Sequence, residues 1–199
     1  MTNLEGYLYK KVKPIIESWN ESGVYAISFF VYSNGAYMYQ GNSNVCEFAI
    51  SYNTEDDVKR NMSSYASANE VRWNYAFWRQ STTHIIDPQE ADDEGIETLF
   101  KWYGENGIDD IGVYSNENQY DETGMYIGKG PGGYFELLTA VSNVAQRLQH
   151  EDFIRVKFGR IPIIVHGLEY DHLVKFATQN ANPNNEAADF LNAAESLFE

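Results

Sequence analysis

Residues 24–40 read VYAISFFVYSNGAYMYQ. Residues 24–32 are almost continuously apolar, β-branched or aromatic, which is typical of a strand. Asn34-Gly35 is a strong signal for a two-residue hairpin turn, so a second strand is predicted from Ala36 to Gln40. A third strand is predicted over residues 45–52. The start of the sheet is therefore expected to be an antiparallel meander.

Helices and further strands alternate along the rest of the chain. Helical spacing, caps and breakers predict helices over residues 3–19, from 54 to about 65, from Asp87-Pro88 to Tyr103, over 134–149, after Asp171 and after Asn182-Pro183. Strands are predicted over residues 70–78, 108–114 and 153–165. No repeat or linker divides the chain. We predict a single α+β domain over residues 1–199, with an at least partly antiparallel sheet flanked by helices.

The chain is strongly acidic. It carries 29 acidic and 14 basic residues, and between Gln80 and Gly128 twelve acids accompany one base, Lys101. Such a field repels nucleic-acid phosphates and anionic membranes, so neither is expected as a partner. Two readings stay open: the acidity keeps the protein dissolved, or it captures a basic protein partner.

The one cysteine and the N-terminus indicate an intracellular protein. Cys46 stands among apolar residues and is expected to be a small filler within a strand. The N-terminus has no apolar run of the length that a signal peptide needs, and no segment approaches the roughly 20 apolar residues of a membrane span. We expect a cytoplasmic location, and the sequence does not indicate an oligomeric state.

Patterns that carry known chemistry fail in detail. The glycine-rich stretch 124–133 contains Gly128-Lys129, but its glycine spacing is one residue short of a phosphate-binding loop and no Ser or Thr follows the lysine. His166 and His172 are six residues apart across a glycine, which matches no zinc-ligand pattern. We therefore expect no catalytic residue, no metal and no cofactor.

The most distinctive segment is EVRWNYAFW, residues 70–78. Large aromatic side chains are buried more often than exposed, yet Trp and Tyr are also enriched in binding hot spots. A mixed role is open, with Trp73 and Phe77 pointing inward while Arg72, Asn74 and Trp78 face a groove.

This segment carries a family resemblance. Together with the early strand and the chain length, the Arg72-Trp73-x-x-x-x-Trp78 element resembles a widespread family of small bacterial proteins of unknown function. That resemblance implies no established activity. In size, acidity and mixed α/β pattern the chain also looks like the immunity proteins that neutralise polymorphic bacterial toxins, many of which are basic nucleases.

The leading hypothesis is a non-enzymatic protein that binds a basic partner, such as a toxin. Its candidate binding residues are Arg72, Trp73, Asn74, Trp78, Asp92, Asp93, Glu94, Asp109 and Asp110. The alternative is an enzyme or small-ligand binder with a pocket between residues 70–79 and the glycine-rich turn 128–133. That pocket would use Glu70, Arg72 and Lys129.

Overall fold

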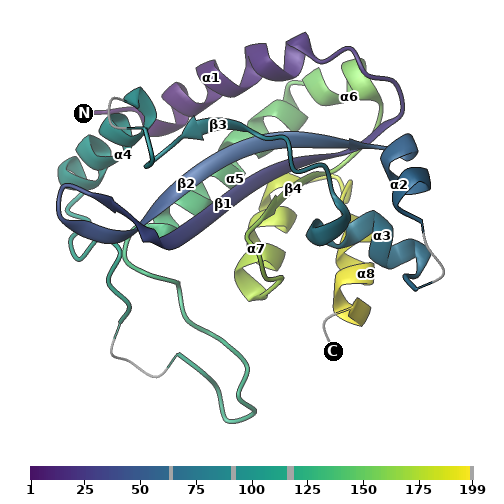
Figure 1. The fold of residues 1–199 in the computed structure, drawn as a ribbon. Coiled ribbons are helices and arrows are strands. Elements are labelled where there is room, and N and C mark those ends of the chain that lie inside the picture. The colour runs from purple at the N-terminus through teal and green to yellow at the C-terminus, as the bar shows by residue number, and fades with distance from the viewer. Residues whose placement is uncertain (63–64, 91–92, 116–118, 198–199) are drawn as a thin grey trace.

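A four-stranded mixed sheet forms the centre of the molecule (Figure 1). The computed structural model describes residues 1–62, 65–90, 93–115 and 119–197. The strands are β1 (Val24–Tyr39), β2 (Asn42–Thr54), β3 (Thr83–Ile86) and β4 (Ile163–His166), in the order β3-β2-β1-β4. β1 and β3 are antiparallel to β2, whereas β4 is parallel to β1. The predicted α+β fold with a partly antiparallel sheet is confirmed.

Helices cover both faces of this sheet. They are α1 (Leu4–Ser18), α2 (Glu55–Asn61), α3 (Ala68–Trp73), the 3-10 turn η1 (Tyr75–Phe77), α4 (Glu94–Glu105), α5 (Tyr134–His150), α6 (Phe153–Phe158), α7 (His172–Ala181) and α8 (Ala188–Leu197). Among the described residues, no helix has both the length and the apolar character needed to cross a bilayer.

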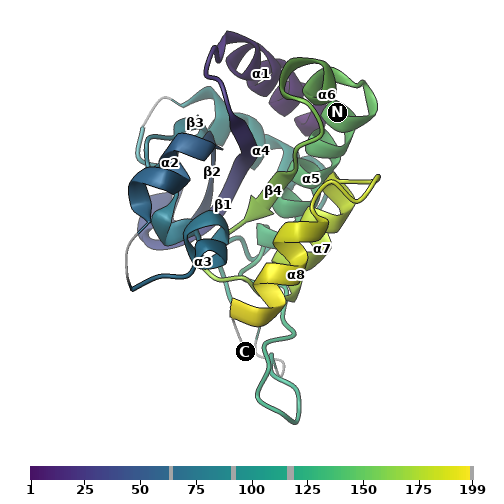
Figure 2. The same cartoon turned by 90° about the vertical axis from the view of Figure 1, so that its right-hand side faces the viewer.

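The two sides of β1 belong to different cores. Ile27, Phe29 and Val31 pack with α1, α4 and α5, whereas Tyr25 packs with the tryptophans of the 70–78 segment and with α8. Ala26 belongs to the same cluster as Tyr25, because an irregularity in register between Val24 and Ala26 interrupts the alternation. Because neighbouring side chains of a strand point to opposite faces, the sheet separates a large core from a smaller, aromatic one. The view in Figure 2 shows α3 and α8 next to each other at one end of the molecule.

Several local predictions are confirmed. Thr54 and Asp57 form the predicted capping box of α2, and Asp171 caps α7. Cys46 is buried within β2.

The predicted hairpin turn at Asn34-Gly35 is wrong. β1 continues through these residues to Tyr39, with an irregularity in register, and the turn lies at Gln40-Gly41. Both of those residues have positive φ, +49° and +82°, as the tight turns that match strand twist require. Consequently β1 and β2 form one long hairpin rather than three short strands.

The predicted strand over residues 70–78 is also wrong. Residues 68–73 form α3 and residues 75–77 form η1. Ser67 and Glu70 make a capping box, in which the Ser67 hydroxyl accepts from the Glu70 N–H and the Glu70 carboxylate accepts from the Ser67 N–H. That cap outweighs the alternation of apolar residues, because it satisfies two backbone donors at the helix start.

Three further predictions need correction. α4 starts at Glu94 with Asp93 as its cap, because Asp87 instead pairs with His84 and accepts from the Gln89 N–H. Residues 108–114 hold a single bridge, between Ile111 and Gly132, rather than a strand. The stretch 153–165, predicted as extended, divides into α6 and β4, and α8 begins at Ala188, after the predicted start at residues 182–183.

Candidate functional site

The aromatic segment is core rather than surface. Trp73 and Trp78 are 5% and 4% exposed. The Trp73 ring meets Tyr25 and Phe190 edge-on, with ring centroids 5.5 and 5.9 Å apart. The inward placement of Trp73 is confirmed, and the expectation that Trp78 faces a groove is wrong.

Arg72 connects this core to α2. Its guanidinium donates to both carboxylate oxygens of Glu55, at 2.6 and 2.9 Å, and lies 4.2 Å from the centroid of the Tyr25 ring. These hydrogen bonds lower the pKa of Glu55. The Arg72 carbonyl accepts from Tyr25 Oη at 2.7 Å and from Trp78 Nε1 at 2.8 Å. With its charge paired in this way, Arg72 mainly holds the segment in place.

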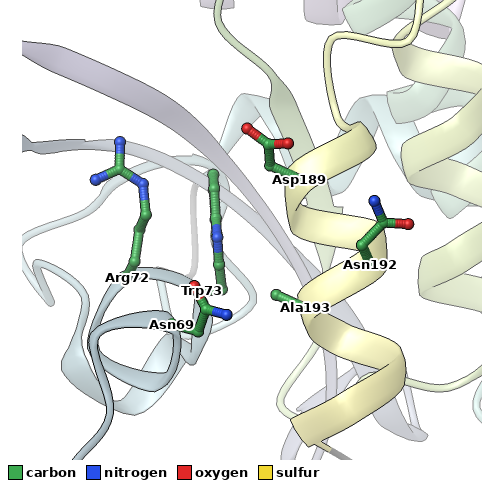
Figure 3. A pocket seen from close by; sticks show the side chains of 6 residues that line it. All are labelled: Asn69, Arg72, Trp73, Asp189, Asn192 and Ala193. Atoms are coloured by element: carbon green, nitrogen blue, oxygen red, sulfur yellow. The ribbon is translucent and has the colours of Figure 1, made fainter.

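A shallow hollow lies beside Arg72, between α3 and α8 (Figure 3). Its volume is about 340 Å³. The lining residues are Asn69, Arg72, Trp73, Asp189, Asn192 and Ala193. The polar members of this set could hydrogen-bond a small polar ligand.

The other predicted pocket residues are not brought together. Glu70 of that pocket forms a local cap, in which its carboxylate accepts from the Ser67 N–H. Asn74, a candidate residue for binding the basic partner, is likewise a local cap, since its side chain accepts from the Ala76 N–H at 2.9 Å. The Lys129 ammonium lies over the Phe135 ring, 5.1 Å from its centroid, at the start of α5. α5 packs on the opposite face of the sheet from the 70–78 segment.

The predicted acidic residues have different roles. Asp93 caps α4 and accepts from the Ile96 N–H at 2.8 Å, and Glu94 pairs with Lys11 of α1 at 2.6 Å. Asp109 and Asp110 are exposed beyond the end of α4. Asp92 lies outside the described residues.

Residues 106–133, here called the α4–α5 loop, connect α4 to α5, and much of their described part projects beyond the sheet and helices (Figures 1 and 2). Ile108, Ile111 and Tyr126 of this loop pack against the large core. Backbone hydrogen bonds close its base, from the Gly112 N–H to the Gly132 carbonyl and from the Gly132 N–H to the Val113 carbonyl, each at 2.9 Å. Asn44 of the β1–β2 hairpin donates to the Gly112 carbonyl at 2.8 Å. The loop is therefore fixed to the sheet at its root.

The tip of this loop has internal contacts of its own. Asp121 Oδ1 accepts from the N–H groups of Thr123 and Met125, at 2.8 and 2.9 Å. The Ile127 N–H donates to the Gln119 carbonyl at 2.8 Å. The described part of the tip thus has a defined shape, which a binding surface needs.

The α4–α5 loop also carries large apolar side chains in solvent. The exposed fractions are 57% for Val113, 54% for Tyr114, 55% for Tyr120, 64% for Met125 and 52% for Ile127. The loop contains five acids and one lysine. Exposed apolar side chains that gather in one place are typical of interaction sites. The sequence prediction identified the acids and missed these apolar residues.

A buried Ser-His pair lies within the aromatic core. Ser28 Oγ is 2.8 Å from His166 Nε2, and His166 Nδ1 is 2.9 Å from the Gly167 carbonyl. Since a carbonyl only accepts, Nδ1 carries the proton and Nε2 accepts from the Ser28 hydroxyl. Ser28 and His166 are 1% and 0% exposed, so this pair cannot reach a substrate in the described conformation.

Glu47 of β2 is a further residue that the sequence prediction missed. It is 6% exposed, although it lies on a strand next to Cys46 and Phe48. The signal was present, because an acid within the apolar run 45–50 is unusual. Within the described residues, no group of three or more His, Cys, Asp or Glu side chains is arranged to hold a metal ion.

No protein-family model matches this chain, and neither the curated proteins nor the solved structures compared with it include a significant match. These comparisons therefore suggest no activity for this chain.

Proposed function

We propose that this chain is a non-enzymatic binding protein for a basic protein partner, and specifically an immunity protein that neutralises a basic toxin. The observation that carries the proposal is the α4–α5 loop, which presents five largely exposed apolar side chains among acidic residues. Apolar area supplies affinity on desolvation. Acidic side chains around it attract a cationic partner and exclude anionic ones.

The position of the loop supports the same proposal. It projects from the body and is tied to the β1–β2 hairpin through Asn44, so its exposed residues can enter a cleft of a partner. Asp109 and Asp110 are exposed near its base, where they can contact the rim of such a cleft. A preorganised loop loses less conformational freedom on binding than a flexible one.

The test begins with the product of the neighbouring gene. We expect that protein to be basic, to arrest growth when it is produced alone, and to be harmless when this chain is produced with it. The association rate of the purified pair should fall as salt rises, because salt screens the attraction between charges. A neighbouring product that is harmless alone, or that does not bind at low salt, would contradict the toxin assignment.

Loop variants localise the interaction. Met125→Ser combined with Ile127→Ser should weaken the complex. We expect the dissociation rate to increase and the association rate to change little, since apolar contacts act mainly on the dissociation rate. Asp109→Asn combined with Asp110→Asn should mainly slow association. Val156→Ser, which removes an 82% exposed apolar side chain from α6, is the matched control and should bind normally.

A second candidate is a small polar ligand in the hollow between α3 and α8, favoured by the presence of Asn69, Asp189 and Asn192 in its lining. A screen of metabolites should then find compounds that raise the melting temperature. Asn192→Leu should abolish that shift. If no compound shifts the wild type, the binding-protein proposal alone is retained.

A further inference from the structure

Glu47 is a buried carboxylate without a partner. No hydrogen bond or ion pair involves its side chain within the part of the chain that the structure describes. Among the described residues, one fully enclosed side-chain nitrogen or oxygen atom lacks a hydrogen-bond partner, and it is Asn53 Nδ2. The carboxylate oxygens of Glu47 also lack a partner but are not fully enclosed, so they keep some contact with solvent. The carboxylate is therefore poorly hydrated, yet it can be reached from solvent.

Aromatic rings stand beside this carboxylate. Tyr32 lies directly opposite Glu47 on β1, and directly opposite side chains in a sheet are close neighbours. The Phe30 ring stacks on Tyr32, with centroids 5.7 Å apart, and on Tyr75, with centroids 5.1 Å apart and planes 4° from parallel. Three rings thus form a continuous row that begins at Tyr32, opposite Glu47.

The nearby charges leave Glu47 unpaired. His84 of β3 pairs with Asp87, with 2.8 Å between Nδ1 and Oδ2. Burial raises the pKa of Glu47, Asp87 raises it further, and His84 only partly opposes this rise. The described residues therefore do not offset the cost of burying this charged carboxylate. A bound cation would offset it.

We propose that Glu47, Tyr32 and Tyr75 form a binding site for one organic cation, a guanidinium or a primary ammonium group, with Phe30 packed between the two tyrosine rings. The carboxylate would accept charge-assisted hydrogen bonds, and ring faces attract such cations. The donor set fits an organic cation better than a metal ion, since no three ligating side chains surround one point within the described residues. The site does not depend on the proposed function, because Glu47 lies on the sheet rather than on the α4–α5 loop.

The cation can come from a free small molecule or from a lysine or arginine side chain of a protein. Two probes separate these sources: N-methylguanidinium chloride and the capped tripeptide acetyl-Gly-Arg-Gly-amide. Each is titrated into the isotope-labelled full chain, with sodium chloride at equal ionic strength as the blank. We expect saturable NMR shifts at the amides of Tyr32, Glu47, Tyr75 and His84. Similar affinities for both probes indicate a free cation, and tighter binding of the tripeptide indicates a protein side chain.

Variants test the assignment. Glu47→Gln should bind at least about thirtyfold more weakly, since removing one partner of a desolvated charge pair has an effect of this size. Glu17→Gln removes the same charge from α1, on the opposite side of the sheet, and should bind as the wild type does. Tyr32→Leu keeps the carboxylate but removes a ring, so it should weaken binding less than Glu47→Gln.

Melting temperatures and amide spectra establish that each variant is folded. Should Glu47→Gln fail to fold, the comparison between Tyr32→Leu and Glu17→Gln decides the matter. The inference is overturned if neither probe causes saturable shifts in the wild type, or if folded Glu47→Gln binds as tightly as the wild type. Neither result bears on the α4–α5 loop, whose variants are measured against the basic protein.

Discussion

Arg79 Nη2 donates to both carboxylate oxygens of Asp57, at 3.0 and 3.3 Å. The same carboxylate accepts from the Thr54 N–H at 2.9 Å and from the Thr54 hydroxyl at 2.7 Å. Burial alone would raise the pKa of Asp57, but the hydrogen bonds from Thr54 and Arg79 outweigh it and the pKa is lowered. One side chain thus holds the start of α2 against the segment that follows η1.

Asp57→Asn should lower the free energy of unfolding by about 3 kcal/mol, because it leaves Arg79 without its counter-charge in a mostly buried setting. Asp56→Asn is the control. Asp56 is exposed and pairs with Lys59 in the next turn, so its change should stay within about 0.5 kcal/mol. Urea unfolding at neutral pH measures both, and equal effects would contradict the structural role of Asp57.

The Ser28–His166 pair makes stability depend on pH. Burial lowers the pKa of His166 to about 4, below the value of about 6.5 in an unfolded chain. Between these two pH values the unfolded state binds more protons than the folded state. The contribution of His166 to the free energy of unfolding is therefore fully present above pH 6.5 and is lost as the pH decreases toward 4. The loss at the end of this window is on the order of 3 kcal/mol.

His166→Gln should remove this part of the pH dependence, whereas Ser28→Ala keeps the histidine and should retain it. The measurement is the free energy of unfolding from pH 7 down to 4, as a difference between each variant and the wild type. Parallel curves for the wild type and His166→Gln would show that the histidine does not titrate as described.

Gly112 joins the α4–α5 loop to the β1–β2 hairpin through a close backbone approach. Its φ is +76°, and a Cβ placed on it would lie 1.7 Å from the Ser43 carbonyl oxygen. Gly124 has a similar φ of +84° but open space around it. Gly112→Ala should therefore destabilise the protein by about 1–3 kcal/mol more than Gly124→Ala, the difference being the steric overlap. Thermal unfolding of the two variants gives this difference directly, and equal losses would argue against a tight approach.

Cys46 should be inert in the folded protein. Burial raises the pKa of its thiol to about 12, and the thiolate is the reactive form. Because it is the one cysteine of the chain, labelling with a thiol reagent should follow the rate of unfolding and accelerate with urea. Rapid labelling in native buffer would mean that β2 opens locally.

Local signals predicted much of this fold. The caps at Thr54 and Asp171 mark α2 and α7 because their side chains accept from backbone N–H groups of the first turn. The run 24–32 predicted the central strand for the same reason that it is buried, namely its lack of charged side chains. Where two local signals competed, as at residues 67–78, the cap outweighed the alternation of apolar side chains.

The remaining features depend on tertiary contacts. Asn34-Gly35 does not turn the chain, because pairing of β1 with β2 continues past it to Gln40-Gly41. The exposure of Met125 and Ile127 follows from the absence of any element over the loop in the described structure, which a sequence pattern does not report. The site at Glu47 requires residues of β1, β2 and η1 to meet, and no spacing along the chain encodes that meeting.

The closed base of the α4–α5 loop has an evolutionary consequence. Since the hydrogen bonds among Gly112, Val113 and Gly132 close the base of the loop, exposed residues between them, such as Met125 and Ile127, can change while Tyr126 keeps its packing against the large core. A lineage can then acquire a new binding specificity through changes in one short segment, while the scaffold that carries it is inherited unchanged.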